Sequence, residues 1–170
     1  MAALPRFFCY SAAVRTLLAN SKAGAETLAS VRELLESQST MTLATVDGQG
    51  RPFATPLFYL PRPDLTLCWL SSADSRHSAS LRRNPRAAVT VYPVVDRWKR
   101  IRGVQMEGAV REISDKTERR QLLTIYRRRF RLGPVLSAAI RQATLYSFRP
   151  AWIRYLDNAR GFGYKIELDL

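Results

Sequence analysis

Short strand-like segments separated by turns fill the middle of this 170-residue chain and leave room for few fold classes. In the longest of them, Val104 and Met106 alternate with Gln105 and Glu107, which is the period of two that a half-buried strand requires. Strands joined by short turns, with one short helix among them, favour a mainly antiparallel sheet that curls into a barrel. The strands are predicted at Met41–Val46, Arg51–Leu60, Leu65–Leu70, Ala87–Tyr92 and residues 100–113.

Helices are expected before and after these strands. Ala25–Ser37 carries apolar residues at helical spacing, and Asp115 with Glu118 fits a capping box for a helix that reaches Phe130. The remaining patterns are a helical turn at 136–140, strand pieces at 144–148 and 151–155, and a last strand at the C-terminus. The expected fold class is mainly β with peripheral helices (α+β), as one domain over residues 23–170. Residues 1–22 are expected to form a loosely ordered extension.

The chain is strongly basic, with a formal net charge of +13. Two segments, 76–103 and 111–131, hold most of the excess of arginine and lysine. Such blocks could serve a phosphorylated ligand, nucleic acid or an anionic surface. Cys9 and Cys68 form no closely spaced pair and His77 is the single histidine, so the usual zinc ligand sets are excluded. No apolar run reaches membrane-spanning length, and a cytoplasmic location is expected.

The stretch Ser71–Pro85 concentrates serines, His77 and three arginines between two predicted strands. Hydroxyl groups and fixed cations at the start of a short helix are suited to binding a phosphate group. The same residues would also be found in an ordinary capped surface helix with solvated arginines. These residues alone therefore leave both interpretations open.

The sequence is poor in groups for acid–base or nucleophilic catalysis. No G-x-S-x-G motif accompanies His77, no P-loop occurs, and no pair of carboxylates follows the strands. A bound cofactor could supply the reactivity that the side chains lack. The same poverty is compatible with a protein that catalyses nothing.

Three stretches in a fixed order carry a resemblance to a known superfamily. They are ATVDGQGRPFATPLFYL, LTLCWLSSADSRHSASLRRNPRAAVTVY and RGVQMEGAVREI, followed by YRRRF and LDNARGFGYKIEL. In this order they resemble the pyridoxamine 5′-phosphate oxidase-like, FMN-binding split β-barrel superfamily, and a small bacterial branch of it rather than the true oxidases. The resemblance covers about 130 residues and implies an antiparallel split barrel.

The resemblance implies a homodimer with FMN between the subunits, with haem or a deazaflavin as less favoured cofactors. The ring would lie beside Thr55, Pro56 and Leu57, while Gln105 would approach it from another strand. The residues implied for the ribityl-phosphate are Ser71, Ser72, Ser75, Arg76 and His77. His77 stands where many members have lysine, and a phosphate partner there would favour its charged form. The arginine-rich strand and late Trp-Arg pair of true oxidases are missing, so pyridoxal phosphate synthesis is not supported.

Three functions follow from these observations. The first is an FMN-dependent oxidoreductase or flavin reductase that takes a small-molecule substrate or electron donor. The second is a nucleic-acid or anion-binding module, in which Tyr126, Phe130 and Trp98 would stack on bases. Against it, Tyr126 and Phe130 fall at helical spacing and are expected in the core. The third is a split-barrel dimer that has lost its cofactor.

Overall fold

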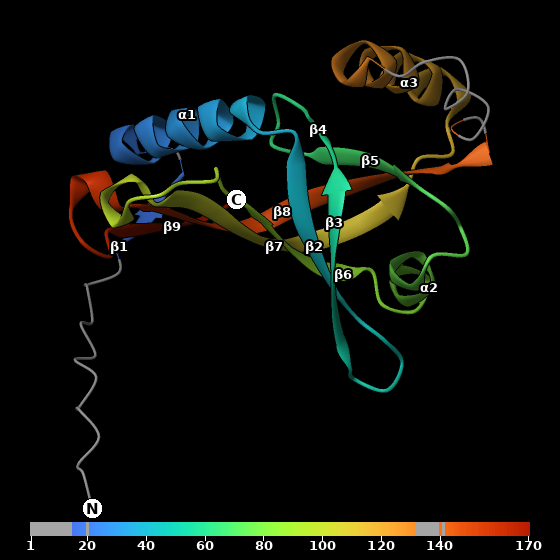
Figure 1. Cartoon of the computed structure of the whole chain (residues 1–170), viewed down its shortest axis with the longest axis horizontal. Coiled ribbons are helices and arrows are strands. Elements are labelled where there is room, and N and C mark those ends of the chain that lie inside the picture. Colours follow the sequence, from blue (N-terminus) through green and yellow to red (C-terminus); the bar gives the residue numbers. More distant parts are fainter. Residues whose placement is uncertain (1–14, 20, 132–139, 141) are drawn as a thin grey trace, which may run out of the picture.

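The computed structural model describes residues 15–19, 21–131, 140 and 142–170 (Figure 1). The helices are α1 (Lys22–Ser37), α2 (Arg76–Arg83) and α3 (Lys116–Phe130), with 3₁₀ turns at Trp98–Arg100 and Asn158–Arg160. The strands are β1 (Arg15–Leu18), β2 (Thr40–Val46), β3 (Pro52–Phe58), β4 (Leu60–Pro61), β5 (Leu67–Ser71), β6 (Arg86–Val91), β7 (Arg102–Glu112), β8 (Thr144–Asp157) and β9 (Lys165–Asp169). The strand predicted over Arg51–Leu60 is interrupted at Tyr59 and becomes β3 and β4.

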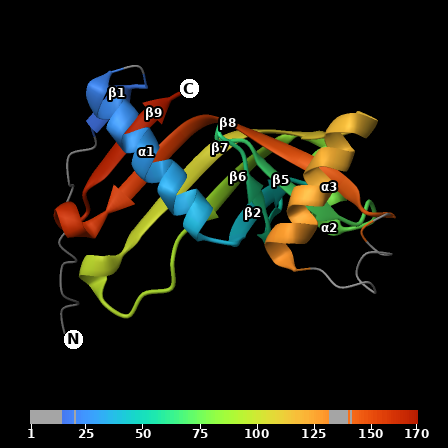
Figure 2. The same cartoon turned by 90° about the horizontal axis from the view of Figure 1, so that it is seen from above.

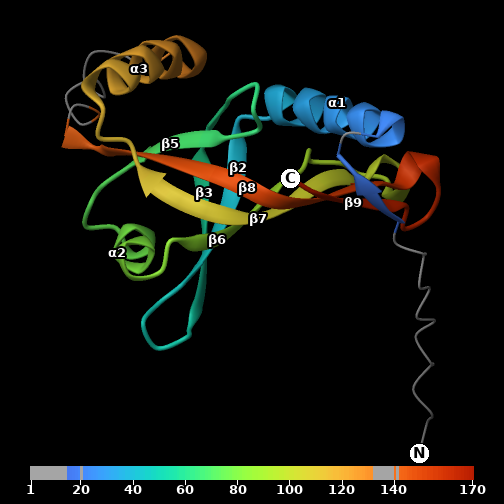
Figure 3. The ribbon, with the colours of Figure 1, turned by 180° about the vertical axis from the view of Figure 1, so that it is seen from behind.

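Within the described residues the strands form one sheet in the order β1-β9-β8-β7-β6-β2-β3, and β5 joins it through β8 and pairs with β4. The neighbouring strands are antiparallel, with β1 beside β9 as the parallel exception. One edge of β8 pairs with β7 along most of its length. The other edge pairs with β5 in the first part of β8 and with β9 in the last part. The sheet therefore curls into a half-open barrel (Figure 3), and the predicted antiparallel split barrel is confirmed.

The two strand pieces predicted around Pro150 are one continuous strand, β8. The ladder with β7 stays intact because its register shifts at a bulge: Glu107 pairs with Trp152, Gly108 pairs with Pro150, and Ala151 is the extra residue. A bulge accommodates a proline inside a sheet, since the missing N–H falls where the ladder is already disrupted. The prediction of two separate pieces was wrong because it treated Pro150 as an end of the strand.

A main core lies between α1 and one face of the sheet, which we call the inner face. Val31 and Leu34 of α1 are fully buried with Leu43 of β2, Met106 of β7 and Ile153 of β8. The Ser21 side chain caps α1 by accepting a hydrogen bond from the Gly24 N–H. The opposite, outer face of the sheet carries the residues that alternate with this core. The alternation predicted for 104–107 is confirmed, since Val104 and Met106 are buried while Gln105 and Glu107 are exposed.

A second apolar cluster lies beneath α3, which covers the other side of β5. Cys68 is fully buried there with Leu122 and Tyr126, as the sequence predicted for this cysteine, and burial raises the pKa of its thiol to about 11. Asp115 begins α3 by accepting from the Glu118 N–H at 2.7 Å, which confirms the predicted N-cap. Viewed from above, α1 lies towards the end of the sheet with β1 and β9, and α3 towards the end with β5 (Figure 2). Arg129 of α3 donates to the carbonyls of Glu36 and Gln38 at the end of α1.

The start of the described chain contains a strand that the sequence did not predict. Arg15–Leu18 forms β1, which pairs in parallel with residues 166–169 of β9. The helical turn predicted at 136–140 falls mainly outside the described residues. Among the described helices, none is both long enough and apolar enough to span a bilayer.

Candidate cofactor site

A serine-rich loop joins β5 to α2 and forms the first turn of that helix. Ser75 is the N-cap, and its Oγ accepts a hydrogen bond from the Ser78 N–H at 3.3 Å. Ser72 supports the loop, since its Oγ accepts from the Asp74 N–H at 3.2 Å and its carbonyl accepts from the Ser78 hydroxyl at 2.9 Å. The first N–H groups of a helix have no intrahelical acceptor, so α2 offers donors at this end. The helix lies on the opposite side of β5 from α3 (Figures 1 and 3), and its Leu81 packs into the main core that α1 also covers.

His77 is buried at the start of α2 and is only 6% exposed. Its Nε2 lies 2.8 Å from Ser71 Oγ and 3.0 Å from Ser75 Oγ, so the ring ties the end of β5 to the helix. Burial lowers the pKa of His77 below its ordinary value of 6.5. The charged form that the resemblance implied is therefore not the form this environment favours, because desolvation opposes the charge and the neighbours are hydroxyl groups. A direct contact of His77 with phosphate stays a prediction.

We expect the free energy of unfolding to fall as the pH drops below the ordinary pKa of histidine. Between the unfolded and the lower folded pKa of His77, the unfolded chain binds more protons, so stability rises with pH there. The slope is at most about 1.4 kcal/mol per pH unit. Urea unfolding of the wild type and His77→Gln between about pH 7.5 and 5.5 measures it. The chain has no other histidine, so the variant should lose this slope, and an unchanged slope would contradict the assignment.

Arg76, the first residue of α2, carries a guanidinium group that retains free donors. Its side chain is half exposed, its Nη2 lies 3.6 Å from Asp47 Oδ2, and its Cζ lies 4.4 Å from the centre of the Phe53 ring. A guanidinium has five N–H donors, so this single long ion pair leaves several for a ligand. Arg82, by contrast, donates to the Ala73 carbonyl at 2.7 Å and holds the loop.

β3 lies at the edge of the described sheet, next to this turn, and contacts β5 as well as β2. Its side chains alternate: Leu57 packs against the main core, while Pro56 is exposed on the outer face. Thr55 and Phe53 share the inner face, so Thr55 lies next to the ring that Arg76 covers. The Thr55 Oγ1 is buried without a hydrogen-bond partner. An orphaned hydroxyl of this kind costs about 1–3 kcal/mol, which a ligand that hydrogen-bonds to it would recover.

Gln105 does not join these residues within one chain. It lies on the outer face in a cross-strand row formed by Pro56, Thr42, Thr90, Gln105 and Arg154. Three strand spacings separate Gln105 from β3, or about 14 Å along the sheet. Its Oε1 accepts a hydrogen bond from Arg154 Nη1 at 3.3 Å, and Arg154 is held by Glu167 through Nη2 at 2.6 Å. The structure therefore places Ser71, Ser72, Ser75, Arg76 and His77 at one turn, with Thr55 on the neighbouring strand. Leu57 packs against the core, Pro56 lies on the outer face, and Gln105 lies three strands away from β3.

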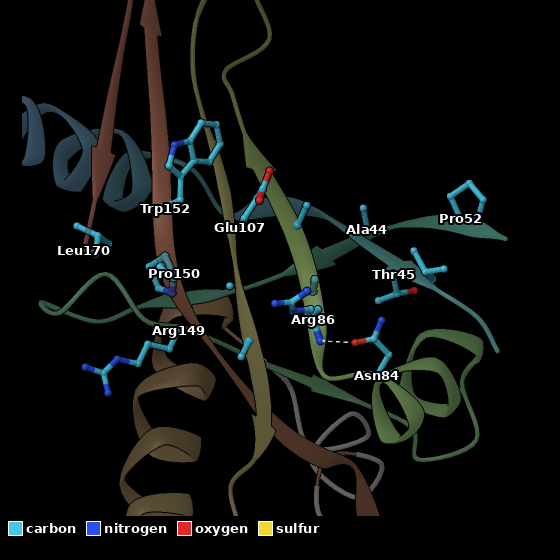
Figure 4. A pocket seen from close by; sticks show the side chains of 16 residues that line it. Ala44, Thr45, Pro52, Asn84, Arg86, Glu107, Arg149, Pro150, Trp152 and Leu170 are labelled. Carbon is cyan, nitrogen blue, oxygen red and sulfur yellow. Dashed lines mark hydrogen bonds between the residues drawn. The ribbon is translucent and has the colours of Figure 1, made fainter. Parts of the chain in front are cut away.

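A groove of about 750 Å³ crosses the outer face beside this row (Figure 4). Small and apolar residues make much of its surface, including Ala44, Ala88 and Pro150. Trp152 and Glu107, which pair across β7 and β8, lie along it, and Asn84 Oδ1 accepts from the Arg86 N–H at 3.1 Å at its end. Sequence reasoning did not select these residues, because the register that joins Glu107 to Trp152 depends on the bulge. The sequence signal that pointed to this face was the alternation that turns Gln105 and Glu107 away from the core.

The comparison with known families decides what kind of protein this is. A family model described as pyridoxamine 5′-phosphate oxidase matches residues 27–157, which run from α1 to the end of β8. The chain belongs to this family. The matched region contains all the site residues that were predicted from the sequence.

Relatives and solved structures of the pyridoxamine 5′-phosphate oxidase family refine this assignment. A UPF0306 protein of Enterobacter sp. (strain 638) is 30% identical over 142 residues, which are 83% of this chain and 95% of that protein. A conserved hypothetical protein of Mycobacterium tuberculosis has a similar fold, with a TM-score of 0.66 at 21% identity over 76% of this chain and 83% of the other. The heme storage protein HutZ of Vibrio cholerae gives a TM-score of 0.61 at 20% identity, over 72% and 88% of the two chains. The similar curated proteins are thus uncharacterised relatives rather than true oxidases.

Proposed function

We propose that this protein binds FMN at the first turn of α2 and acts as a flavin-dependent oxidoreductase. The proposal rests on one observation: three features of a phosphate-binding site lie close together. They are a capped helix start rich in hydroxyls, the partly free guanidinium of Arg76, and the orphaned Oγ1 of Thr55 on the adjoining strand. A phosphate group is suited to the first two, since charge-assisted hydrogen bonds from a guanidinium and a helix N-terminus are the strongest it can accept.

The flavin itself would supply the hydride and electron chemistry. In the proposed site, Ser72 and the first N–H groups of α2 bind the phosphate together with Arg76, while His77 positions Ser71 and Ser75 through its two hydrogen bonds. At the free edge of β3 the Pro56 carbonyl is available to the polar edge of a planar ring, because the backbone groups of Thr55 and Leu57 pair with β2. In this proposal the protein binds and orients the flavin and the flavin carries out the reaction, which suits a sequence poor in groups for acid–base catalysis.

A second copy of the chain completes the proposed site. Gln105 and Arg154 lie on the outer face, too far along the sheet to reach β3 of their own chain. The groove on that face, lined by alanines, prolines and Trp152, is a surface that another sheet could cover. A homodimer formed through this face could bring Gln105 of one subunit towards the flavin that β3 of the other subunit holds.

Haem is a weaker candidate for this chain. The solved neighbour HutZ is described as a heme storage protein, but the similarity of fold says nothing about the ligand here. Haem iron usually takes a histidine, cysteine, methionine or tyrosine side chain. His77 is the single histidine, is buried, and uses Nε2 for two hydroxyl contacts that iron ligation through this atom would break.

A nucleic-acid-binding role receives less support than the flavin role. Tyr126 lies on the buried face of α3, and the partly buried Phe130 packs against both Tyr126 and Phe58, with ring centres 4.5 and 5.0 Å apart, so both rings are already engaged within the chain. Arg129 is occupied by the end of α1. Trp98 alone of the three proposed stacking residues is half exposed, and it packs edge-on against Phe162.

Purification and titration with FMN test the proposal. We expect a flavin absorption spectrum, a stoichiometry of one FMN per chain, a particle of two chains by light scattering, and reduction of the bound flavin by NADH or NADPH without oxygen. A protein that stays colourless and shows no saturable FMN binding would overturn the cofactor assignment. A monomer that binds FMN would overturn the dimer, and a loaded dimer that no donor reduces would overturn the enzymatic role.

A further inference from the structure

A cationic cavity lies between α2 and the β2–β3 turn, and Arg76 is part of its lining. It has a volume of about 330 Å³ and is lined by Arg51, Arg76 and Arg83 together with Asp47 and small residues. It includes none of the serines of the proposed flavin site, nor Thr55. On α2, Arg76 and Arg83 are seven positions apart with Ala79 and Ser80 between them, so they share one face of the helix.

Asp47 organises the turn side of this cavity. Its Oδ1 accepts from the backbone N–H groups of Gln49 at 2.9 Å and Arg51 at 3.0 Å, and its Oδ2 accepts from Arg51 Nε at 2.9 Å. These hydrogen bonds hold the pKa of Asp47 at about 2, so the carboxylate stays ionised and fixed. It orients Arg51 and attracts Arg76, but one carboxylate cannot neutralise three guanidinium groups.

Arg83 is the cation that Asp47 does not engage. Among the described residues it has no ion pair, and its Nη1 lies against the backbone of Gly48, only 2.7 Å from where a Cβ on that glycine would stand. A side chain at position 48 would displace this guanidinium. The cavity therefore gathers three positive groups around one negative group, and mutual repulsion of the cations is relieved when an anion enters.

We infer that this cavity binds a phosphoryl anion with more than one phosphate, of the pyrophosphate or nucleotide-diphosphate class, independently of FMN. Guanidinium forks match phosphate oxygens with paired hydrogen bonds, and three guanidinium groups that line one cavity offer more donors than one phosphate needs. The concave shape favours a compact ligand over a nucleic-acid strand, which is bound along an extended groove with stacked bases. Arg76 borders both sites, whereas Arg51 and Arg83 belong to this cavity alone.

Calorimetric titration with pyrophosphate at about 0.15 M salt tests the inference, because weak surface attraction is screened there. We expect saturable binding by the wild type and a loss of about tenfold or more in affinity for both Arg83→Ala and Arg51→Ala, since each removes charge-assisted hydrogen bonds. Arg120→Ala, which removes an exposed arginine of α3, is the matched control and should bind as the wild type does. Thermal unfolding checks that each variant is folded.

FMN titration of the same proteins separates this site from the flavin site. We expect Arg83→Ala to keep the FMN affinity of the wild type, and pyrophosphate to leave FMN bound. If the wild type binds pyrophosphate but not FMN, the proposed function is wrong and this inference is supported. The inference is overturned if no saturable binding occurs, if Arg120→Ala weakens it equally, if a single-stranded oligonucleotide binds more tightly through Arg83, or if FMN and pyrophosphate compete.

Discussion

Gly108→Ala should lower the free energy of unfolding by about 2–3 kcal/mol, the upper range for forcing a methyl group into a packed site. A Cβ at Gly108 would stand 2.1 Å from the Arg149 carbonyl oxygen and 2.9 Å from Pro150 Cα. These are backbone atoms of the bulge, so no side chain can swing away to make room. The substitution should spread β7 from β8 at the point where the barrel bends.

Urea denaturation monitored by tryptophan fluorescence measures this effect. Gly103→Ala is a matched control in the same strand, because its Cβ would meet Val91 O at 3.3 Å and Tyr92 Cβ at 3.4 Å, contacts that small shifts relieve. Gly103 is buried, but these contacts are more than 1 Å longer than the closest one at Gly108, so we expect the control to cost less than about 1 kcal/mol, the low end for adding a methyl group to a packed site. Equal stability of Gly108→Ala and the wild type would show that the bulge does not constrain this position.

Arg76→Ala should weaken FMN binding by about 10- to 100-fold, the range expected when a charge-assisted hydrogen bond of about 1.5–3 kcal/mol is removed. The fold should be little affected, since the ion pair of Arg76 with Asp47 is long and half exposed, and such pairs contribute about 0–1 kcal/mol. Quenching of flavin fluorescence gives the affinity, and Arg120→Ala serves as the control. Wild-type affinity in Arg76→Ala would remove this residue from the phosphate site.

Thr55→Val is a companion variant that separates binding from folding. The Thr55 hydroxyl is buried and has no hydrogen-bond partner, and valine puts a methyl group of similar size in its place. The free energy of unfolding should therefore stay the same or rise. The FMN affinity should fall if that hydroxyl is held ready for the cofactor. A loss of stability would instead show that Thr55 Oγ1 already has a structural role.

Strands, helices and the hydroxyl-rich turn could be predicted because their signals are local. The alternation of Val104, Gln105, Met106 and Glu107 and the cap at Asp115 depend on neighbouring residues only. The burial of His77 is different, although a hint existed: His77 and Leu81 are four positions apart and share the buried face of α2. Neither interpretation of Ser71–Pro85, as a phosphate site or as a capped surface helix, used this spacing.

Features that depend on strand register could not be obtained from the sequence. Gln105 was expected near the flavin site, but the register places it beside Thr90 and Arg154 on the outer face. The outer groove likewise depends on Ala151 being the extra residue of the bulge. Pairing of β1 with β9 joins residues about 150 positions apart, which no local pattern encodes.

The central claim is that the first turn of α2 recognises the phosphate of a flavin. Parallel titrations of the wild type with FMN and with riboflavin, which has the same ring but no phosphate, test this claim most directly. We expect FMN to bind at least about tenfold more tightly, and Arg76→Ala to remove most of this difference while leaving riboflavin affinity unchanged. Equal affinities for FMN and riboflavin in the wild type would contradict it.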